Sequence, residues 1–479
     1  MYPEPSRMSA LRRLFLALLL LVLPVCGAAQ AAQTEQPQQP PSPSSIQSDH
    51  PVTKAEAKEL FRSVDDILEF ISHDTGLPIR HKVKRKLITR DQVQKFVEQR
   101  IKTDQDAQRL ERSQLVLKKF GMIPAGYDLH AEFVKLLREQ VAAYYDPKTK
   151  TVNLLDWVAP DLQRPVLAHE LTHALQDQAV GLTQWLRAGG KDNGNLPDQE
   201  ELVSEEAQAA RENVSEGQAM LAMLDYTLAP SGLSVVKSPE VVDAMRATMT
   251  DDKDLPEAAA APVYLRESLY MPYTFGLDFE RAVLVKNGTT AAYAGMLEHP
   301  PVDTLQVMKP DDYVNNRRVS PLNVPDLDRL IAPDYERYDF GGIGAFDIYL
   351  MAKQYAPDQN AKEYYPHWRG GYYLAPHRKT APKQQIGLIF FSRWDSPESA
   401  KLFATLYGDY VPTRYKGANR LPASCPVAQG ESECNILEWD TSEGRVALER
   451  QGTDLLVLEG FDAATERRLR AAAFERRVH

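Results

Sequence analysis

Residues 165–180 read Pro-Val-Leu-Ala-His-Glu-Leu-Thr-His-Ala-Leu-Gln-Asp-Gln-Ala-Val. The apolar residues of this stretch recur every three or four positions, which predicts an amphipathic, half-buried helix. On such a helix His169 and His173 stand one turn apart on the same face. Both imidazoles can then reach one Zn²⁺ at about 2.0–2.1 Å. Two unrelated helix histidines are the alternative, and the unbroken helical pattern on both sides favours the metal site.

Glu170 follows the first histidine directly. From there its carboxylate can lie beside a metal without binding it, and can take a proton from a nearby water. The pattern H-E-x-x-H is typical of zinc proteases. The sequence therefore predicts a site that hydrolyses an amide bond, with Glu170 as the general base.

A catalytic zinc takes a third protein ligand and leaves one position open. The next histidine after His173 is His299, which excludes the scheme H-E-x-x-H-x-x-G-x-x-H. A glutamate from the following helix, expected over residues 200–226, is the other scheme. The candidates are Glu205, Glu206, Glu212 and Glu216. The first two are expected in an exposed acidic turn.

Glu216 is the favoured third ligand because small residues flank it. Gly217 and Ala219 should let this helix approach the zinc helix closely, and the apolar run 219–224 indicates a buried face on which a carboxylate needs a cation. Glu212 lies one turn earlier on the same face. It is the alternative ligand, or the group that orients a ligand histidine.

His169–His173, followed some forty residues later by Glu216-Gly217-Gln218-Ala219, resembles the gluzincin metallopeptidases. The stretches 143–148 and 169–178 resemble uncharacterised exported bacterial proteins of this kind. The resemblance covers residues 140–230 well and the rest weakly. It implies that His169, His173 and Glu216 bind zinc and that Glu170 is the general base.

Gluzincins often carry an aspartate four residues after the ligand glutamate, where this chain has Met220. We therefore expect Glu212 or Asp177 to orient a ligand histidine. A donor that stabilises the oxyanion is also needed. By residue type the candidates are Tyr226, Tyr273 and His299.

The N-terminus predicts export. Arg12 and Arg13 precede an apolar run over 14–24 that is too short to span a bilayer, and Ala29-Gln30-Ala31 is a cleavage candidate. We expect a signal peptide over 1–31, then a disordered linker over 32–52 rich in Gln, Pro and Ser. Lipid anchoring at Cys26 is the alternative. The mature protein is expected in the periplasm or outside the cell, without a membrane span.

Removing the signal peptide leaves Cys425 and Cys434. A pair of cysteines in an exported protein predicts a disulfide, here one that closes a short surface loop. Two zinc-binding thiols are the alternative, but no nearby His or Cys completes such a site.

The expected fold class is α+β. A helical region over 53–140 should precede a mostly helical zinc-metallopeptidase core over 141–360, and a small α+β subdomain should follow over 361–479. Strands over 141–146 and 151–155 predict a β-hairpin before the zinc helix. Its edge is a candidate surface for holding a substrate as an added strand. The C-terminal part should contain a strand over 386–391, a helix over 396–407 and a hairpin over 445–459.

The formal net charge is −10, no basic face stands out, and the short basic run 82–86 suits a solvated strand or helix edge. Nucleic acid is therefore not an expected partner. A protein or peptide substrate is expected, and the sequence assigns no oligomeric state. The alternatives are a non-catalytic zinc protein that binds or matures a partner, and an amidase acting on cell-wall peptides. Glu170 argues against the former, because a structural zinc needs no base.

Overall fold

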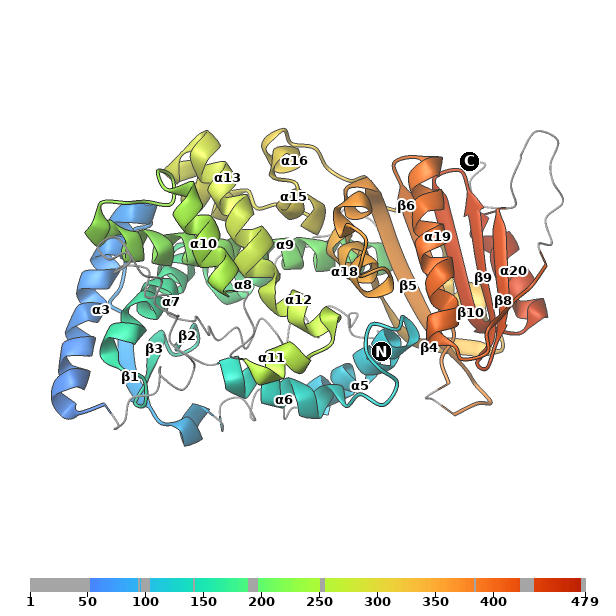
Figure 1. The fold of residues 1–479 in the computed structure, drawn as a ribbon, viewed down its shortest axis with the longest axis horizontal. Helices are drawn as coiled ribbons and strands as arrows, with labels where there is room; N and C mark the ends of the chain where they lie inside the picture. Colours follow the sequence, from blue (N-terminus) through green and yellow to red (C-terminus); the bar gives the residue numbers. More distant parts are fainter. Residues whose placement is uncertain are drawn as a thin grey trace.

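The computed structural model describes residues 52–93, 95, 104–140, 143–187, 197–249, 255–382, 385–422 and 435–474. The chain has a mixed α+β fold, with a helical part beside a large sheet (Figure 1). The expected signal peptide, most of the linker, and both Cys425 and Cys434 lie outside the described residues. None of the described helices is long and apolar enough to cross a membrane.

The first described helix, α3 (Lys54–Thr75), begins at a capping box formed by Thr53 and Glu56. A three-stranded sheet follows, in the order β1-β3-β2, from β1 (Lys84–Ile88), β2 (Tyr144–Asp146) and β3 (Thr151–Leu155). The predicted hairpin of β2 and β3 is confirmed. The basic run contributes to β1, which pairs in parallel with β3 and was not predicted as part of this sheet. Helices α5 (Asp104–Lys119) and α6 (Leu129–Gln140) lie in the region expected to be helical.

Two long helices form the centre of the helical part: α7 (Pro160–Val180) and α9 (Pro197–Leu228). Between them lies α8 (Leu182–Arg187), although the Gly, Asn and Asp residues of 181–200 predict a loop. Gly181 ends α7 in the left-handed conformation that glycine adopts easily, and the chain then turns to bury Leu182 and Trp185. Figure 1 shows α9 reaching from this helical part toward the large sheet.

The segment 227–334 is a succession of short helices. They are η2 (Ala229–Ser231), α10 (Pro239–Met249), α11 (Pro256–Ala260), α12 (Val263–Met271), the π-helix η3 (Pro272–Gly276), α13 (Leu277–Asn287), the π-helix η4 (Ala291–Gly295), α14 (Met296–Glu298), α15 (Thr304–Met308), α16 (Pro310–Val314) and α17 (Leu327–Ile331).

The large sheet has seven strands in the order β4-β5-β6-β10-β9-β8-β7, and every pairing is antiparallel. The strands are β4 (Tyr335–Gly342), β5 (Trp368–Arg378), β6 (Leu388–Trp394), β7 (Asn419–Arg420), β8 (Ile436–Thr441), β9 (Gly444–Gln451) and β10 (Asp454–Phe461). Strand β4 precedes residue 361, so the sheet crosses the predicted domain boundary. Short helices η5 (Ala361–Glu363) and η6 (Tyr365–His367) lie just before β5.

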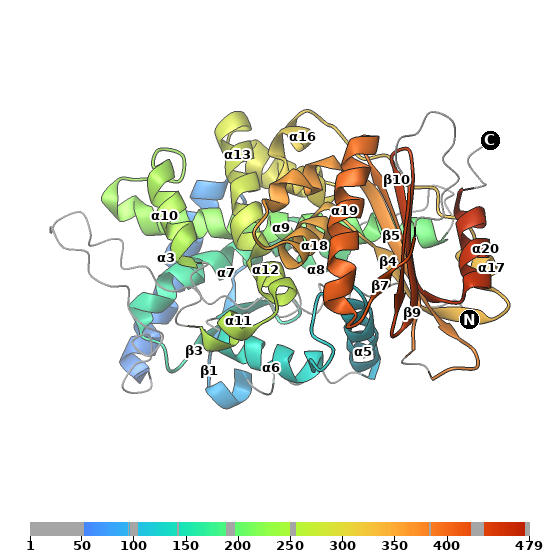
Figure 2. The ribbon, with the colours of Figure 1, turned by 45° about the vertical axis from the view of Figure 1, so that its right-hand side comes forward.

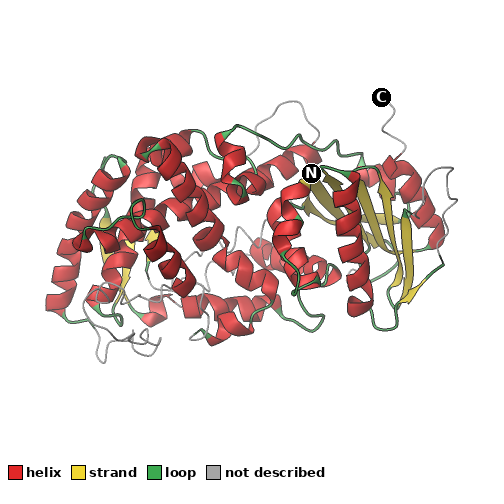
Figure 3. Ribbon diagram, turned by 45° about the horizontal axis from the view of Figure 1, so that its top comes forward, coloured by secondary structure: helices red, strands yellow, loops and turns green. Residues whose placement is uncertain are grey.

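Helices cover both faces of this sheet (Figure 2). The core on one side includes residues of α18 (Ala345–Tyr355) and α19 (Pro397–Arg414), and the core on the other includes α17 and α20 (Ala463–Phe474). The predicted helix at 396–407 is confirmed with Ser396 as its N-cap, and it extends to Arg414. The predicted 445–459 hairpin is confirmed as β9 and β10. Figure 3 shows the strands gathered in two separate groups among the helices.

Candidate metal centre

Helix α7 carries both histidines deep inside the helical part. Every residue from Val166 to Asp177 is buried, so the helix is enclosed on all sides rather than half-buried as predicted. Helices α3, α8 and α9 and the small sheet pack around it. The polar residues of the motif therefore point into protein and need polar partners there.

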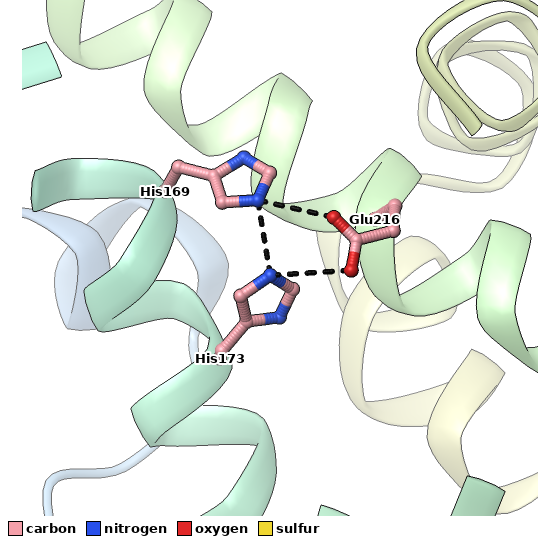
Figure 4. A group of neighbouring side chains, drawn as sticks. All are labelled: His169, His173 and Glu216. Carbon is pink, nitrogen blue, oxygen red and sulfur yellow. Dashed lines mark hydrogen bonds and ion pairs between the residues drawn. The ribbon is translucent and has the colours of Figure 1, made fainter. Parts of the chain in front are cut away.

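His169, His173 and Glu216 converge on one point (Figure 4). One ligand atom from each lies within 4.8 Å of the others, and all three side chains are buried. The Nε2 atoms of the two histidines are 3.0 Å apart. Glu216 places Oε2 at 3.1 Å from Nε2 of His169 and Oε1 at 3.4 Å from Nε2 of His173. This group could hold a metal ion.

The ionisation of the three side chains is strongly coupled. Burial lowers the pKa of His169 to about 4. Burial also opposes a charge on His173, but the charge of Glu216 outweighs it and raises the pKa of His173 to about 9. Burial opposes the charge of Glu216 as well, yet the nearby histidines lower its pKa to about 2. Without a metal, the cluster thus holds a carboxylate and a proton in close contact.

Of the four candidate glutamates, only Glu216 belongs to this group. The expectation that Glu205 and Glu206 are exposed is wrong, because both are buried. Glu205 accepts a hydrogen bond from the backbone N–H of Gly342 at 2.7 Å, and Glu206 accepts two from Thr304. These two glutamates attach α9 to the end of β4 and to α15. Both contacts join residues far apart in the sequence, so the acidic run by itself does not predict them.

Two groups contact Nδ1 of His173: Oε1 of Gln176 at 2.9 Å and the hydroxyl oxygen of Ser215 at 3.3 Å. The sequence pointed to Glu212 or Asp177 for this role. Glu212 instead accepts from Gln208 at 2.9 Å, and Asp177 accepts from the hydroxyl of Tyr145 at 2.8 Å and pairs with a lysine of the hairpin turn. Gln176 lies three residues after His173, a spacing that could have suggested it.

Glu170 stands beside the three-residue group and is not a member of it. Its Oε2 accepts a hydrogen bond from the backbone N–H of Tyr145 at 2.6 Å, and its Oε1 is buried without a hydrogen-bond partner among the described residues. Burial raises the pKa of Glu170 to about 8. Tyr145 belongs to β2, an edge strand of the small sheet, so this bond joins the carboxylate to that edge.

Tyr273 is the oxyanion candidate on an element that packs beside Glu216: its π-helix η3 contacts α9, where Gly276 of η3 meets Gly217. It lies on η3, and burial followed by the charges of Glu216 and Glu170 raises the pKa of its phenol. Tyr226 instead packs edge-on against Phe70, with ring centroids 5.3 Å apart.

His299, the remaining candidate, is exposed at the end of α14. Its backbone carbonyl accepts a hydrogen bond from the hydroxyl of Tyr313.

Gly217 makes the approach of η3 to α9 possible. A Cβ at this position would lie 2.4 Å from the carbonyl oxygen of Gly276, and a Cβ on Gly276 would lie 2.7 Å from that of Asn213. Gly217 does allow a close helix contact, as predicted, but the predicted neighbour is wrong. The residue contacts η3 and α13 rather than α7. The small residue after Glu216 therefore helps to bring Tyr273 to the site.

Comparison of the chain with protein-family models, curated proteins and solved structures found no match.

Proposed function

We propose that this protein is an exported zinc-dependent metallopeptidase. The observation that carries the proposal is the meeting of His169, His173 and Glu216 in a buried group with Glu170 beside it. Two imidazoles and one carboxylate are a common donor set of catalytic zinc sites, where a fourth position stays open. A structural zinc site usually has four closed protein ligands instead.

The electrostatics of the group support a bound cation. The two Nε2 atoms lie 3.0 Å apart and both face the carboxylate of Glu216. Electron pairs gathered this closely repel one another unless a proton or a cation lies among them. When bound there, zinc would polarise the substrate carbonyl and lower the pKa of a water toward about 7.

Glu170 is the proposed general base. Its Oε2 is held by the N–H of Tyr145, whereas its buried Oε1 has no described partner. Burial raises the pKa of Glu170 to about 8 without a metal, and a cation held by the adjacent group would lower that pKa. Oε1 of the resulting carboxylate can then accept the proton of the attacking water. The same carboxyl group then delivers that proton to the leaving amine. Anchoring one oxygen limits rotation of the carboxylate, which keeps the other oriented for proton transfer.

Two further elements complete the proposed site. The phenol of Tyr273 donates a hydrogen bond to the oxyanion that develops on the substrate. Strand β2 lies at a sheet edge. The N–H of Tyr145 already donates to Glu170, so an extended peptide added there would pair with the other backbone groups of this edge. Export is supported by the N-terminal sequence, with its arginines, short apolar run and cleavage candidate.

Two matched variants test the metal site: Glu216→Ala and Glu212→Ala. Both remove a buried glutamate from the same face of α9, one turn apart. We expect purified wild type and Glu212→Ala to contain about one zinc per chain and Glu216→Ala to lose it, measured by mass spectrometry of the metal. The proteins that contain zinc should hydrolyse a peptide library, and zinc-free Glu216→Ala should not. A wild type that binds zinc and cleaves no peptide would instead favour a non-catalytic zinc protein.

A further inference from the structure

A chain of buried side-chain amides lies behind His173, outside the three-residue group. It consists of Gln176 on α7 and Gln218 on α9, both with no exposed surface, and it ends on η4. Ser215 on α9 joins it from the side. Each hydrogen bond in this chain has a donor and an acceptor. The direction of the bonds follows from the backbone carbonyls at its end, which can only accept.

The direction begins at η4. Nε2 of Gln218 lies 2.7 Å from the carbonyl oxygen of Ala292 and 3.1 Å from that of Tyr293. Backbone carbonyls only accept hydrogen bonds, so the amide nitrogen of Gln218 must point toward them. The oxygen of Gln218 is therefore turned toward Gln176.

The same reasoning fixes Gln176. Its Nε2 lies 2.9 Å from Oε1 of Gln218 and 2.9 Å from the carbonyl oxygen of Ser215, and both atoms are acceptors. Its Oε1 consequently faces Nδ1 of His173 at 2.9 Å and accepts a second bond from the hydroxyl of Ser215 at 3.0 Å. The hydroxyl oxygen of Ser215 also lies 3.3 Å from Nδ1, but its single proton is donated to Gln176, so it can only accept from the ring. An amide oxygen cannot donate either, so Nδ1 of His173 carries the proton.

We propose that Gln176 and Gln218 form an amide relay that fixes the protonated nitrogen of His173 at Nδ1 and so presents Nε2 to the metal. The relay rests on the proposed metal centre, and its members are positioning residues rather than ligands. Ligand histidines commonly donate their second N–H to a carboxylate, a backbone carbonyl or water. Here a neutral amide takes that role, in a buried site that already contains the carboxyl groups of Glu170 and Glu216. A further buried negative charge would be costly there.

The relay is tested by Gln176→Leu and Gln218→Leu, singly and together. Gln306→Leu is the matched control, because Gln306 is also buried and donates to a backbone carbonyl, that of Arg317, away from the metal centre. Zinc affinity is measured by competition with a chelator. We expect Gln176→Leu to weaken zinc binding about 10–100-fold. Gln218→Leu should weaken it less, with little further effect once Gln176 is replaced, and the control should leave it unchanged.

A second measurement uses the wild type and so does not depend on whether a variant folds. In protein labelled with ¹⁵N-histidine, the Nδ1–H proton of His173 should be protected from exchange with solvent, with or without zinc. Absence of this protected proton from the wild type would overturn the relay, as would equal zinc affinities of Gln218→Leu and wild type. A wild type that shows the protected proton yet binds no zinc would overturn the proposed function, and with it the relay's role toward a metal, while the fixed position of the His173 proton would stand.

Discussion

Replacing Glu170 by glutamine should separate catalysis from metal binding and folding. The amide oxygen of glutamine can still accept the N–H of Tyr145, which now donates to the carboxylate at 2.6 Å. The side chain keeps its size and stays outside the three-residue group, so zinc content should remain that of the wild type. What is lost is the ability to take up a proton at Oε1.

Positioned general bases contribute about 10²–10⁴-fold to rate. At about 1.4 kcal/mol per factor of ten, Glu170→Gln should raise the activation barrier by roughly 3–6 kcal/mol. The assay compares initial rates of peptide-library hydrolysis at equal zinc content, read by mass spectrometry of the products.

The matched control is Glu205→Gln. Glu205 is also buried and accepts a backbone N–H, that of Gly342 at 2.7 Å, but it lies at the end of α9 that contacts β4. The folded Glu205→Gln variant should keep wild-type activity. Zinc-loaded Glu170→Gln that retains activity within about tenfold of the wild type would refute the role of Glu170 as base.

Three further predictions concern the surroundings of the site. Tyr273→Phe should lower kcat about 10²–10³-fold without loss of zinc, as expected for an oxyanion donor, whereas Tyr226→Phe should leave kcat unchanged; equal rates for both would remove Tyr273 from the site. Gly217→Ala should cost about 1–3 kcal/mol of stability in chemical denaturation, because its Cβ would lie 2.4 Å from the carbonyl oxygen of Gly276; an unchanged midpoint would contradict the close contact. Burial, and then the charge of Asp225, raise the pKa of Asp74 to about 7. Its ionisation therefore opposes folding as pH rises from about 4 to 7. Asp74→Asn should be more stable than the wild type by on the order of 1–3 kcal/mol at pH 8 and about equal to it at pH 4, and parallel stability curves across this range would exclude the effect.

Local regularities made much of the secondary structure predictable. The strands flanking residues 147–150 and the helix at 129–140 depend on turn residues and on apolar periodicity, and both appear in the structure. Strand β1 was missed as a sheet member because its pairing with β3 joins residues more than sixty positions apart. Strand β4 was also missed, because among the described residues it pairs with β5, thirty or more positions later and beyond α18.

The exposure of acidic residues was the poorest inference from the sequence. Glu205 and Glu206 sit in an acidic run, which usually indicates a solvated helix face. Their carboxylates instead satisfy backbone N–H groups of distant segments, at Gly342 and Thr304. Such pairing depends on which helix and strand ends pack against α9. The spacing of residues within α9 does not predict it.

The sequence alone determined that His169 and His173 share a helix face with Glu170 beside them, because the helical repeat is a local property of the backbone. It also singled out Glu216 from three other glutamates through its small neighbours. Tertiary structure decided the rest: the meeting of Glu216 with the histidines, the approach of Tyr273 on η3, and the contact of Gln176 with His173. These depend on how α7, α9 and the π-helices η3 and η4 pack, and the direction of the hydrogen bonds behind His173 follows from two carbonyl groups more than a hundred residues further along the chain.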